Sequence, residues 1–325
     1  MKAHNLLIAV VLLGGCKGGN DYAAMAKAAN AARADGGNED LLPVPANATL
    51  LAHSQNHPRG LQLVGNTVYW LNAGGRTVGK KGVFSASSSG GGNVTTLMAS
   101  DADVMAMGAD ATHAYFLAPR EGRVFKVANN GGIPEELAAT TDISRGLVID
   151  EANVYWAENA GIYRVPKAGG KPALVTEAGI PDVLQVDESH VYWYSTLAGV
   201  ISRAPKKGGA ASKVHADDKH TLHMFLVDGP DVFVSYGANE KMVIEKVPKG
   251  GGTPVKIAEG QIPGADFAAD ANFVYWITED DIFKVPRNGG PVSKVVAKIA
   301  HGKDIAVDGQ YVYWADRTRV NRMPK

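Results

Sequence analysis

The sequence predicts an all-β protein, a seven-bladed β-propeller of four-stranded antiparallel blades that spans residues 45–325. An aromatic motif of the type Val-Tyr-Trp recurs about every 40 residues, which is the length of one blade. Each copy lies in a segment rich in β-branched residues and in glycine pairs that suit tight turns. The last copy is truncated, and a segment near the start of the chain matches the missing piece.

The aromatic motif has seven copies, and all five tryptophans of the chain occupy its third position. The copies begin at Val68, Ala114, Val154, Val191, Val232, Val274 and Val312. An aspartate precedes the motif by four residues in six copies, where its carboxylate can accept hydrogen bonds from the backbone of a tight turn. These aspartates are Asp110, Asp150, Asp187, Asp228, Asp270 and Asp308, and the first copy has Val64 instead.

The third unit shows how one repeat divides into four strands. Leu147–Ile149 is a short apolar strand, and the aromatic motif begins the second. Residues 162–166 alternate with the period of a third strand, and a turn at Gly169 and Gly170 leads to an outer strand at 172–175. The last unit ends at Lys325 before any outer strand, so Ala48–Ala52 should supply that strand and close the ring.

This pattern resembles the YWTD, NHL and TolB-like propeller repeats, in which an aspartate, a four-residue step and an aromatic pair mark each blade. The chain is also similar to bacterial β-propeller lipoproteins of unknown function. The resemblance covers about residues 45–325 and implies a fold but no activity. YWTD propellers have six blades, whereas this sequence has seven motifs.

Residues 1–15 are expected to be a signal peptide, because two basic residues precede an apolar run, Leu6–Leu13, that is too short to span a bilayer. The segment Leu13–Cys16 resembles the lipobox of bacterial lipoproteins, in which the cysteine is lipidated. Cys16 is the only cysteine, so no intramolecular disulfide competes with this reading. We expect a lipid on Cys16, a flexible tether over residues 16–44, and a location at the cell envelope.

Lys17 follows the predicted lipidation site, and the resemblance then implies the outer membrane rather than the inner one in a Gram-negative cell. The charge is balanced, with 33 basic and 33 acidic residues. This balance argues against a nucleic-acid partner, because such a partner needs a basic face to replace its counterions.

A ligand site is expected at one end of the propeller, around the central axis, where the innermost strands begin. A mixed set of charges there could hold a carboxylated or sugar-like ligand, or could form a solvated rim whose charges pair with one another. The candidate ligand-binding residues are Arg59, Arg145, Asp182, His223, Asp266 and Asp304.

The opposite end should carry the aspartate turns together with a basic residue that follows the third strand of most blades. These basic residues are Lys167, Lys206, Lys249, Arg287 and Lys325. They could form a patterned surface for a polyanion, or they could be turn residues paired with neighbouring aspartates.

Two functions are compatible with this sequence. The first is a non-enzymatic scaffold that binds a protein or glycan partner. The second is a lyase or hydrolase, with a metal or without one, because virginiamycin-lyase-like propellers use a histidine near the channel with a metal. The histidines of residues 215–223 have no ligand spacing typical of a metal site, so we expect no metal, no cofactor and no assignable catalytic residue.

Overall fold

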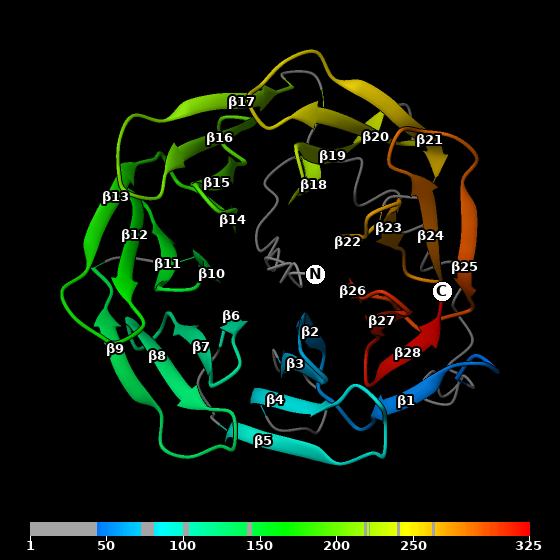
Figure 1. Ribbon diagram of the computed structural model, residues 1–325, viewed down its shortest axis with the longest axis horizontal. Coiled ribbons are helices and arrows are strands. Elements are labelled where there is room, and N and C mark those ends of the chain that lie inside the picture. The colour runs from blue at the N-terminus through cyan, green and yellow to red at the C-terminus, as the bar shows by residue number, and fades with distance from the viewer. Residues whose placement is uncertain are drawn as a thin grey trace.

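Seven four-stranded antiparallel sheets form a ring in the computed structural model, so the predicted propeller is confirmed (Figure 1). The structure describes residues 44–72, 81–99, 104–141, 145–217, 220, 222–238, 241–261 and 264–325. Within these ranges the chain forms strands and turns, and no helix there could cross a membrane. The predicted signal peptide, Cys16 and the tether up to residue 43 lie outside the described residues.

The blades are numbered along the chain, and each runs from its innermost to its outermost strand. Blade 1 is β2 (Pro58–Val64), β3 (Thr67–Asn72), β4 (Gly82–Ser87) and β5 (Val94–Ala99). Blade 2 is β6 (Ala106–Ala109), β7 (His113–Ala118), β8 (Arg123–Ala128) and β9 (Glu135–Ala139). Blade 3 is β10 (Arg145–Ile149), β11 (Asn153–Glu158), β12 (Gly161–Pro166) and β13 (Ala173–Glu177). Blade 4 is β14 (Val183–Val186), β15 (His190–Ser195), β16 (Val200–Pro205) and β17 (Ser212–Ala216).

The remaining blades follow the same order. Blade 5 is β18 (Leu222–Asp228), β19 (Asp231–Ala238), β20 (Lys241–Pro248) and β21 (Val255–Gln261). Blade 6 is β22 (Asp266–Ala269), β23 (Phe273–Ile277), β24 (Asp281–Pro286) and β25 (Ser293–Ala297). Blade 7 is β26 (Asp304–Val307), β27 (Tyr311–Ala315), β28 (Val320–Pro324) and, as its outer strand, β1 (Thr49–Ala52).

The ring is closed by the two ends of the folded chain, as the truncated last repeat predicts. Strand β1 pairs antiparallel with β28, with Thr49 opposite Arg322 and Leu50 opposite Asn321. In Figure 1, β1 and β28 lie side by side although they are drawn in blue and red. The outer edge of β28 is therefore covered by a strand from the other end of the chain.

The aromatic motif forms the core because its side chains alternate across the second strand of each blade. Trp70, Trp156, Trp276 and Trp314 are at most 1% exposed. The apolar clusters extend across neighbouring blades: one of them joins Tyr155 and Ile162 of blade 3 to Leu184 and Trp193 of blade 4. A blade therefore buries its apolar faces only when both neighbours are in place.

Two innermost strands also reach their neighbours through a glutamine. Gln62 donates to the carbonyl of Met107 at 2.9 Å and accepts from the amide of Ala109 at 2.7 Å. Gln185 makes the same pair of bonds to Phe225 and Val227 of blade 5. Each glutamine side chain thus provides hydrogen-bond partners for a buried carbonyl and a buried amide in the innermost strand of the next blade.

We expect that removing the chain up to Ala52 exposes the edge of β28 and the buried contacts of Leu51, so that the protein unfolds or associates with other copies. Removal of residues 1–43 alone should leave a folded monomer, because β1 is retained. Light scattering coupled to size-exclusion chromatography measures both variants. A stable monomer without β1 would contradict closure by this strand.

Candidate functional site

Two ends of the propeller are distinguished by their loops. The mouth face is the end where the innermost strands begin, and the turn face is the end where the aspartate turns lie. Each candidate residue from the sequence lies within one position of the first residue of an innermost strand, so these residues lie around the axis at the mouth face. Of Arg145 the structure describes the backbone at the start of β10 but not the side chain.

Asp266 and Asp304 form a buried carboxyl pair across the boundary between blades 6 and 7. Asp304 accepts from the amides of Gly60 and Leu61 in blade 1, at 2.7 and 3.0 Å. Asp266 accepts from the amide of Ile305 at 3.2 Å. Both side chains are less than 9% exposed, so the pair holds blades 6, 7 and 1 together at the axis.

Burial is the main cause of the unusual titration of this pair, because it disfavours the charged form of each carboxyl. It raises the pKa of Asp304 to about 6, although the Gly60 and Leu61 amides oppose the shift. Burial and the neighbouring Asp304 charge raise the pKa of Asp266 well above its ordinary value. The hydrogen bond between the two side chains favours the protonated form of Asp266 and the charged form of Asp304, so Asp266 is the donor of the pair.

A positively charged corner lies beside this pair, where blade 7 meets blade 1. His57 lies within the field of Arg317, Lys303 and Arg59. Burial, and then these three cations, lower the pKa of the His57 imidazole. The loop that carries His57 is fixed to the β27–β28 turn by a bond from its amide to the carbonyl of Arg317, at 3.1 Å.

The histidines of residues 215–223 lie at the boundary between blades 4 and 5, but their side chains have separate environments. His220 binds Asp217 at 2.8 Å, and its ring stacks on Tyr236 with centroids 4.9 Å apart. His223 is half-buried, and its Nδ1 has no hydrogen-bond partner among the described residues. Burial lowers the pKa of His223 and of His215, so both are neutral at pH 7.

Asp182 is also engaged locally, since its Oδ2 accepts from the amide of Thr196 at 2.8 Å. Across the described ranges no group of three or more histidine, cysteine, aspartate or glutamate side chains could hold a metal ion. The mouth face therefore contributes one charged corner and one buried carboxyl pair rather than a set of groups aimed at a common point.

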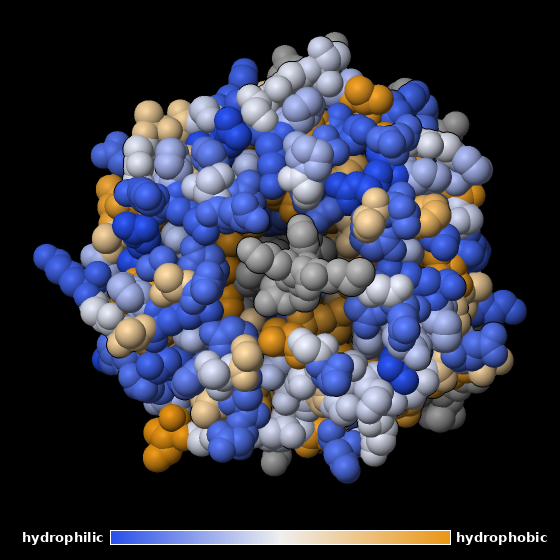
Figure 2. All heavy atoms as spheres, in the orientation of Figure 1, coloured by the Kyte–Doolittle hydropathy of each residue, from blue (hydrophilic) through white to orange (hydrophobic). Residues whose placement is uncertain are grey.

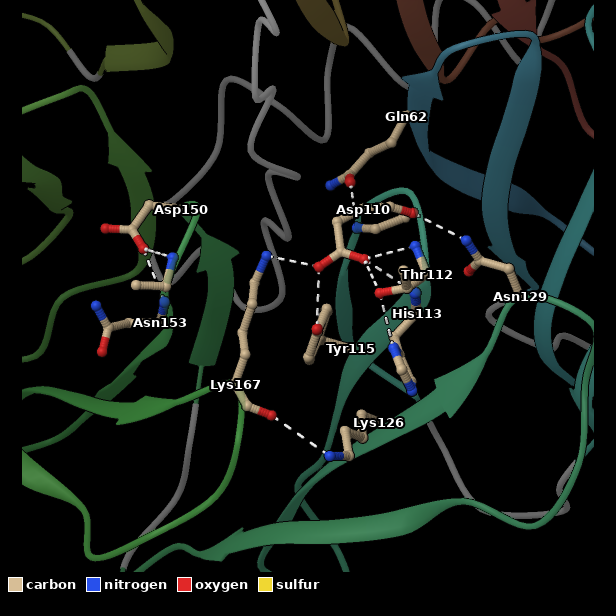
Figure 3. Close-up of polar contacts among 12 residues, drawn as sticks. Gln62, Asp110, Thr112, His113, Tyr115, Lys126, Asn129, Asp150, Asn153 and Lys167 are labelled. Carbon is tan, nitrogen blue, oxygen red and sulfur yellow. Dashed lines mark hydrogen bonds and ion pairs between the residues drawn. The ribbon is translucent and has the colours of Figure 1, made fainter.

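The turn face contains an arrangement that the sequence suggested only in part. Asp110 accepts from the amides of Thr112 and His113 through Oδ1, at 2.8 and 2.9 Å. Its Oδ2 accepts from the Tyr115 hydroxyl at 3.0 Å and from Lys167 of blade 3 at 2.7 Å (Figure 3). We call this unit, an aspartate and an aromatic residue of one blade with a cation of the next, a tie.

Five of the boundaries between blades carry a tie. The pairs are Lys167 with Asp110, Lys206 with Asp150, Lys249 with Asp187, Arg287 with Asp228, and Lys325 with Asp270. The cationic side chains are only 12–19% exposed. Burial alone would raise the pKa of Asp110 and Asp187, but the lysine and two backbone amides together hold it well below its ordinary value.

Of the two alternatives that the sequence left open for these basic residues, the structure shows the one in which they pair with aspartates. Each reaches the aspartate of the preceding blade, which a reading of one repeat at a time does not reveal. In the view of Figure 1, hydrophilic residues cover most of the visible face and apolar residues form scattered areas (Figure 2).

No protein-family model matches the sequence, and no curated protein matches it. Solved structures do match. A catalytically inactive histidine-to-alanine variant of virginiamycin B lyase from Staphylococcus aureus, with quinupristin, is 15% identical, with coverage of 86% of this chain and 98% of that chain and a TM-score of 0.66. YCF48 bound to a D1 peptide is 11% identical, with coverage of 87% and 96% and a TM-score of 0.60. A chain of the nidogen/laminin complex is 15% identical, with coverage of 63% and 86% and a TM-score of 0.50. At these identities the likeness shows the fold.

Replacement of Lys206 by Met should lower the free energy of unfolding by about 1–3 kcal/mol, because Asp150 loses a partly buried charged partner. Lys207→Met is a matched control, since Lys207 is exposed, and should change stability by less than about 0.5 kcal/mol. Urea denaturation measures both. Equal effects of the two substitutions would contradict a stabilising role for the tie.

Asp266→Asn and Asp304→Asn should act in opposite directions at pH 8. A folded-state pKa above the unfolded value makes stability fall as pH rises through the folded pKa. Asp266→Asn keeps a donor to Asp304 but cannot ionise, so it should raise the free energy of unfolding at pH 8 by about 1–2 kcal/mol. Asp304→Asn removes an acceptor from the amide of Gly60 or Leu61 and should lower it by about 1–3 kcal/mol.

Denaturation at several pH values between 5 and 8 tests this pair of substitutions. The advantage of Asp266→Asn over the wild type should shrink as the pH falls. His215 and His223 have lowered pKa values and act in the opposite sense, since their contribution is lost below their ordinary value of 6.5. Both proteins contain these histidines, so the difference between variant and wild type cancels that contribution. A pH-independent difference would contradict the shared proton.

Proposed function

We propose that this protein is a lipid-anchored protein of the bacterial cell envelope whose propeller binds a protein partner without catalysing a reaction. The observation that carries the proposal is the use of the mouth-face carboxylates. Asp304, Asp266 and Asp182 each accept from a backbone amide. These bonds fix the backbone at the mouth face, so the three carboxylates have a structural role that needs no substrate.

A protein partner is favoured over a glycan by the similar structures. The YCF48 structure is bound to a D1 peptide, and the other chain comes from a nidogen/laminin complex. They align with 87% and 63% of this chain. The largely hydrophilic face in Figure 2 suits a partner that is held by polar and charged contacts.

Cross-linking from each face tests the scaffold. A photo-reactive residue at Leu197, which is 81% exposed in the β15–β16 turn, probes the mouth face. One at Ile133, which is 95% exposed between β8 and β9, probes the turn face. We expect one protein to be captured in cells from one face only, and the purified pair to bind with a dissociation constant of about 1 μM or less. The proposal would be contradicted if neither position captured a protein whose binding could be reproduced with the purified pair.

An enzyme remains the second candidate because the lyase fold aligns over 86% of this chain and His223 is neutral with a partner-less ring nitrogen. Incubation of the purified protein with quinupristin tests it directly. We expect no product by mass spectrometry, with or without divalent metal ions. If the wild type converted quinupristin and His223→Phe abolished this turnover, the lyase proposal would replace the scaffold proposal.

Lipidation at Cys16 is tested by labelling cells with a palmitate analogue. The wild type should carry the label and sediment with membranes, because stable anchoring needs more than one acyl chain. Cys16→Ser should lose the label and leave the membrane fraction, since no other cysteine is present. The outer membrane is the proposed location in a Gram-negative cell, and density-gradient separation of the two membranes tests it. Label on the Cys16→Ser protein would contradict the assignment.

A further inference from the structure

The boundary between blade 7 and blade 1 contains a tie without its cation. Asp308 accepts from the amides of Gln310 and Tyr311 through Oδ1, both at 2.7 Å. Its Oδ2 accepts from the Tyr313 hydroxyl at 2.7 Å. These bonds repeat the aspartate half of the tie at Asp110.

A backbone bond identifies the position that should supply the cation. In blade 4 the amide of Lys206 donates to the carbonyl of Ser189, which lies two residues after the turn aspartate. In blade 1 the amide of Ser88 makes the equivalent bond to Asn66. Ser88 therefore occupies the place of the lysine. Its hydroxyl hydrogen-bonds to the Tyr313 side chain but contributes no positive charge.

Asp308 is also more exposed than the aspartates of the ties, as expected for a carboxylate that no cation covers. Asp308 is exposed, whereas the five aspartates that hold a cation are only partly exposed. Throughout the described ranges no basic side chain forms an ion pair with Asp308. Asp308 is therefore open to solvent at the turn face, whereas Tyr313 is 1% exposed. We call Asp308, together with the Tyr313 hydroxyl that it binds, the socket.

Arg322 lies nearby and hydrogen-bonds to the Tyr313 side chain, but among the described residues it forms no ion pair with Asp308. Its guanidinium lies over the Tyr311 ring, 4.2 Å from the centroid, and donates to the carbonyl of Ser89 at 3.1 Å. The matching residue in blade 3, Arg164, likewise hydrogen-bonds to the tyrosine of its own blade, Tyr155, and donates to the carbonyl of Lys206. Lys206 nevertheless binds Asp150 at 2.7 Å, so an arginine in this register coexists with a cation in the socket.

The boundary between blades 1 and 2 shows a different outcome. Val64 replaces the aspartate there, and Asn129 stands in the register of the lysine. Asn129 donates instead to the carbonyl of Asp110 at 2.9 Å. Both charges are absent from that boundary, whereas a carboxylate is retained at Asp308.

We propose that Asp308 and Tyr313 bind a primary alkylammonium group from outside the ring, namely a lysine side chain of a protein partner. The filled ties define the chemistry. In Lys167 and Lys249 the ammonium binds the carboxylate at 2.7–2.8 Å and lies 5.0 and 5.9 Å from the tyrosine centroid. The one tie with an arginine is the one in which Phe233 replaces the tyrosine. Only the protein origin of the lysine rests on the proposed function.

Titration of the ¹⁵N-labelled full-length chain with Nα-acetyl-lysine methylamide tests the socket without any partner. The amide signals of Gln310 and Tyr311 should shift progressively with the concentration of the compound, with a dissociation constant of about 0.2 M or weaker, because one exposed ion pair contributes little binding free energy. Nα-acetyl-norleucine methylamide, which lacks the charge, should leave these signals unchanged. Equal shifts with the two compounds overturn the proposal.

Ser88→Lys gives an internal test because it supplies the missing cation and leaves Asp308 and Tyr313 intact. It should abolish the response to the lysine amide and raise the melting temperature by about 1–3 °C. Ser88→Met has similar length and no charge, and it should do neither. A Ser88→Lys protein that still responds to the lysine amide overturns the socket.

The source of the ammonium group is settled by a photo-reactive residue at the exposed Gln310. A partner's lysine is supported if a protein is captured in cells and two changes each abolish the capture. The first change is Ser88→Lys in this chain, and the second is replacement of one lysine in the captured protein. Binding of the lysine amide without such a capture overturns the protein source and leaves a socket for small primary amines. The two results therefore separate failure of the socket from failure of the scaffold.

Discussion

The ring depends on carboxylates that are largely withdrawn from water and are still charged. In the four ties that contain a lysine, two backbone amides fix one oxygen of the aspartate, and the other oxygen accepts from the lysine of the next blade. A lysine there completes the coordination, and the ring of the tyrosine covers one side of the ammonium group. The tie joins the backbone-fixed aspartate of one blade to a side chain of the next, so it restricts the spacing between blades as well as adding to stability.

The fold could be predicted from the sequence because one blade is written into one repeat. Trp156 and the glycines at 169 and 170 report the core and a turn within a single unit, where Gly169 has a φ of 90° that suits glycine. Closure could be predicted as well, since Ala48–Ala52 matched the missing outer strand. These features depend on local periodicity, which a sequence displays directly.

The site was less predictable because it depends on contacts between repeats. Lys167 and Asp110 are 57 residues apart, and neither residue type indicates that it binds a specific partner rather than water. Asp266 and Asp304 looked like ligand-binding charges at the start of innermost strands, yet the adjacent strands bury them. The sequence contains one signal of these contacts: Val64 stands in place of the repeated aspartate, and Asn129 stands in place of the basic residue in the next repeat.

The pairing of β1 with β28 has a consequence for the order of events during folding. Thr49 lies opposite Arg322, so the last contact of the ring joins residues that are separated by almost the whole domain. Lys325 also completes the tie to Asp270. The other six blades precede β28 along the chain, so β1 has no partner strand until residues 320–324 have been synthesised. The interval between synthesis and closure is thus the period in which this protein is most open to capture by a chaperone or by a second copy of itself.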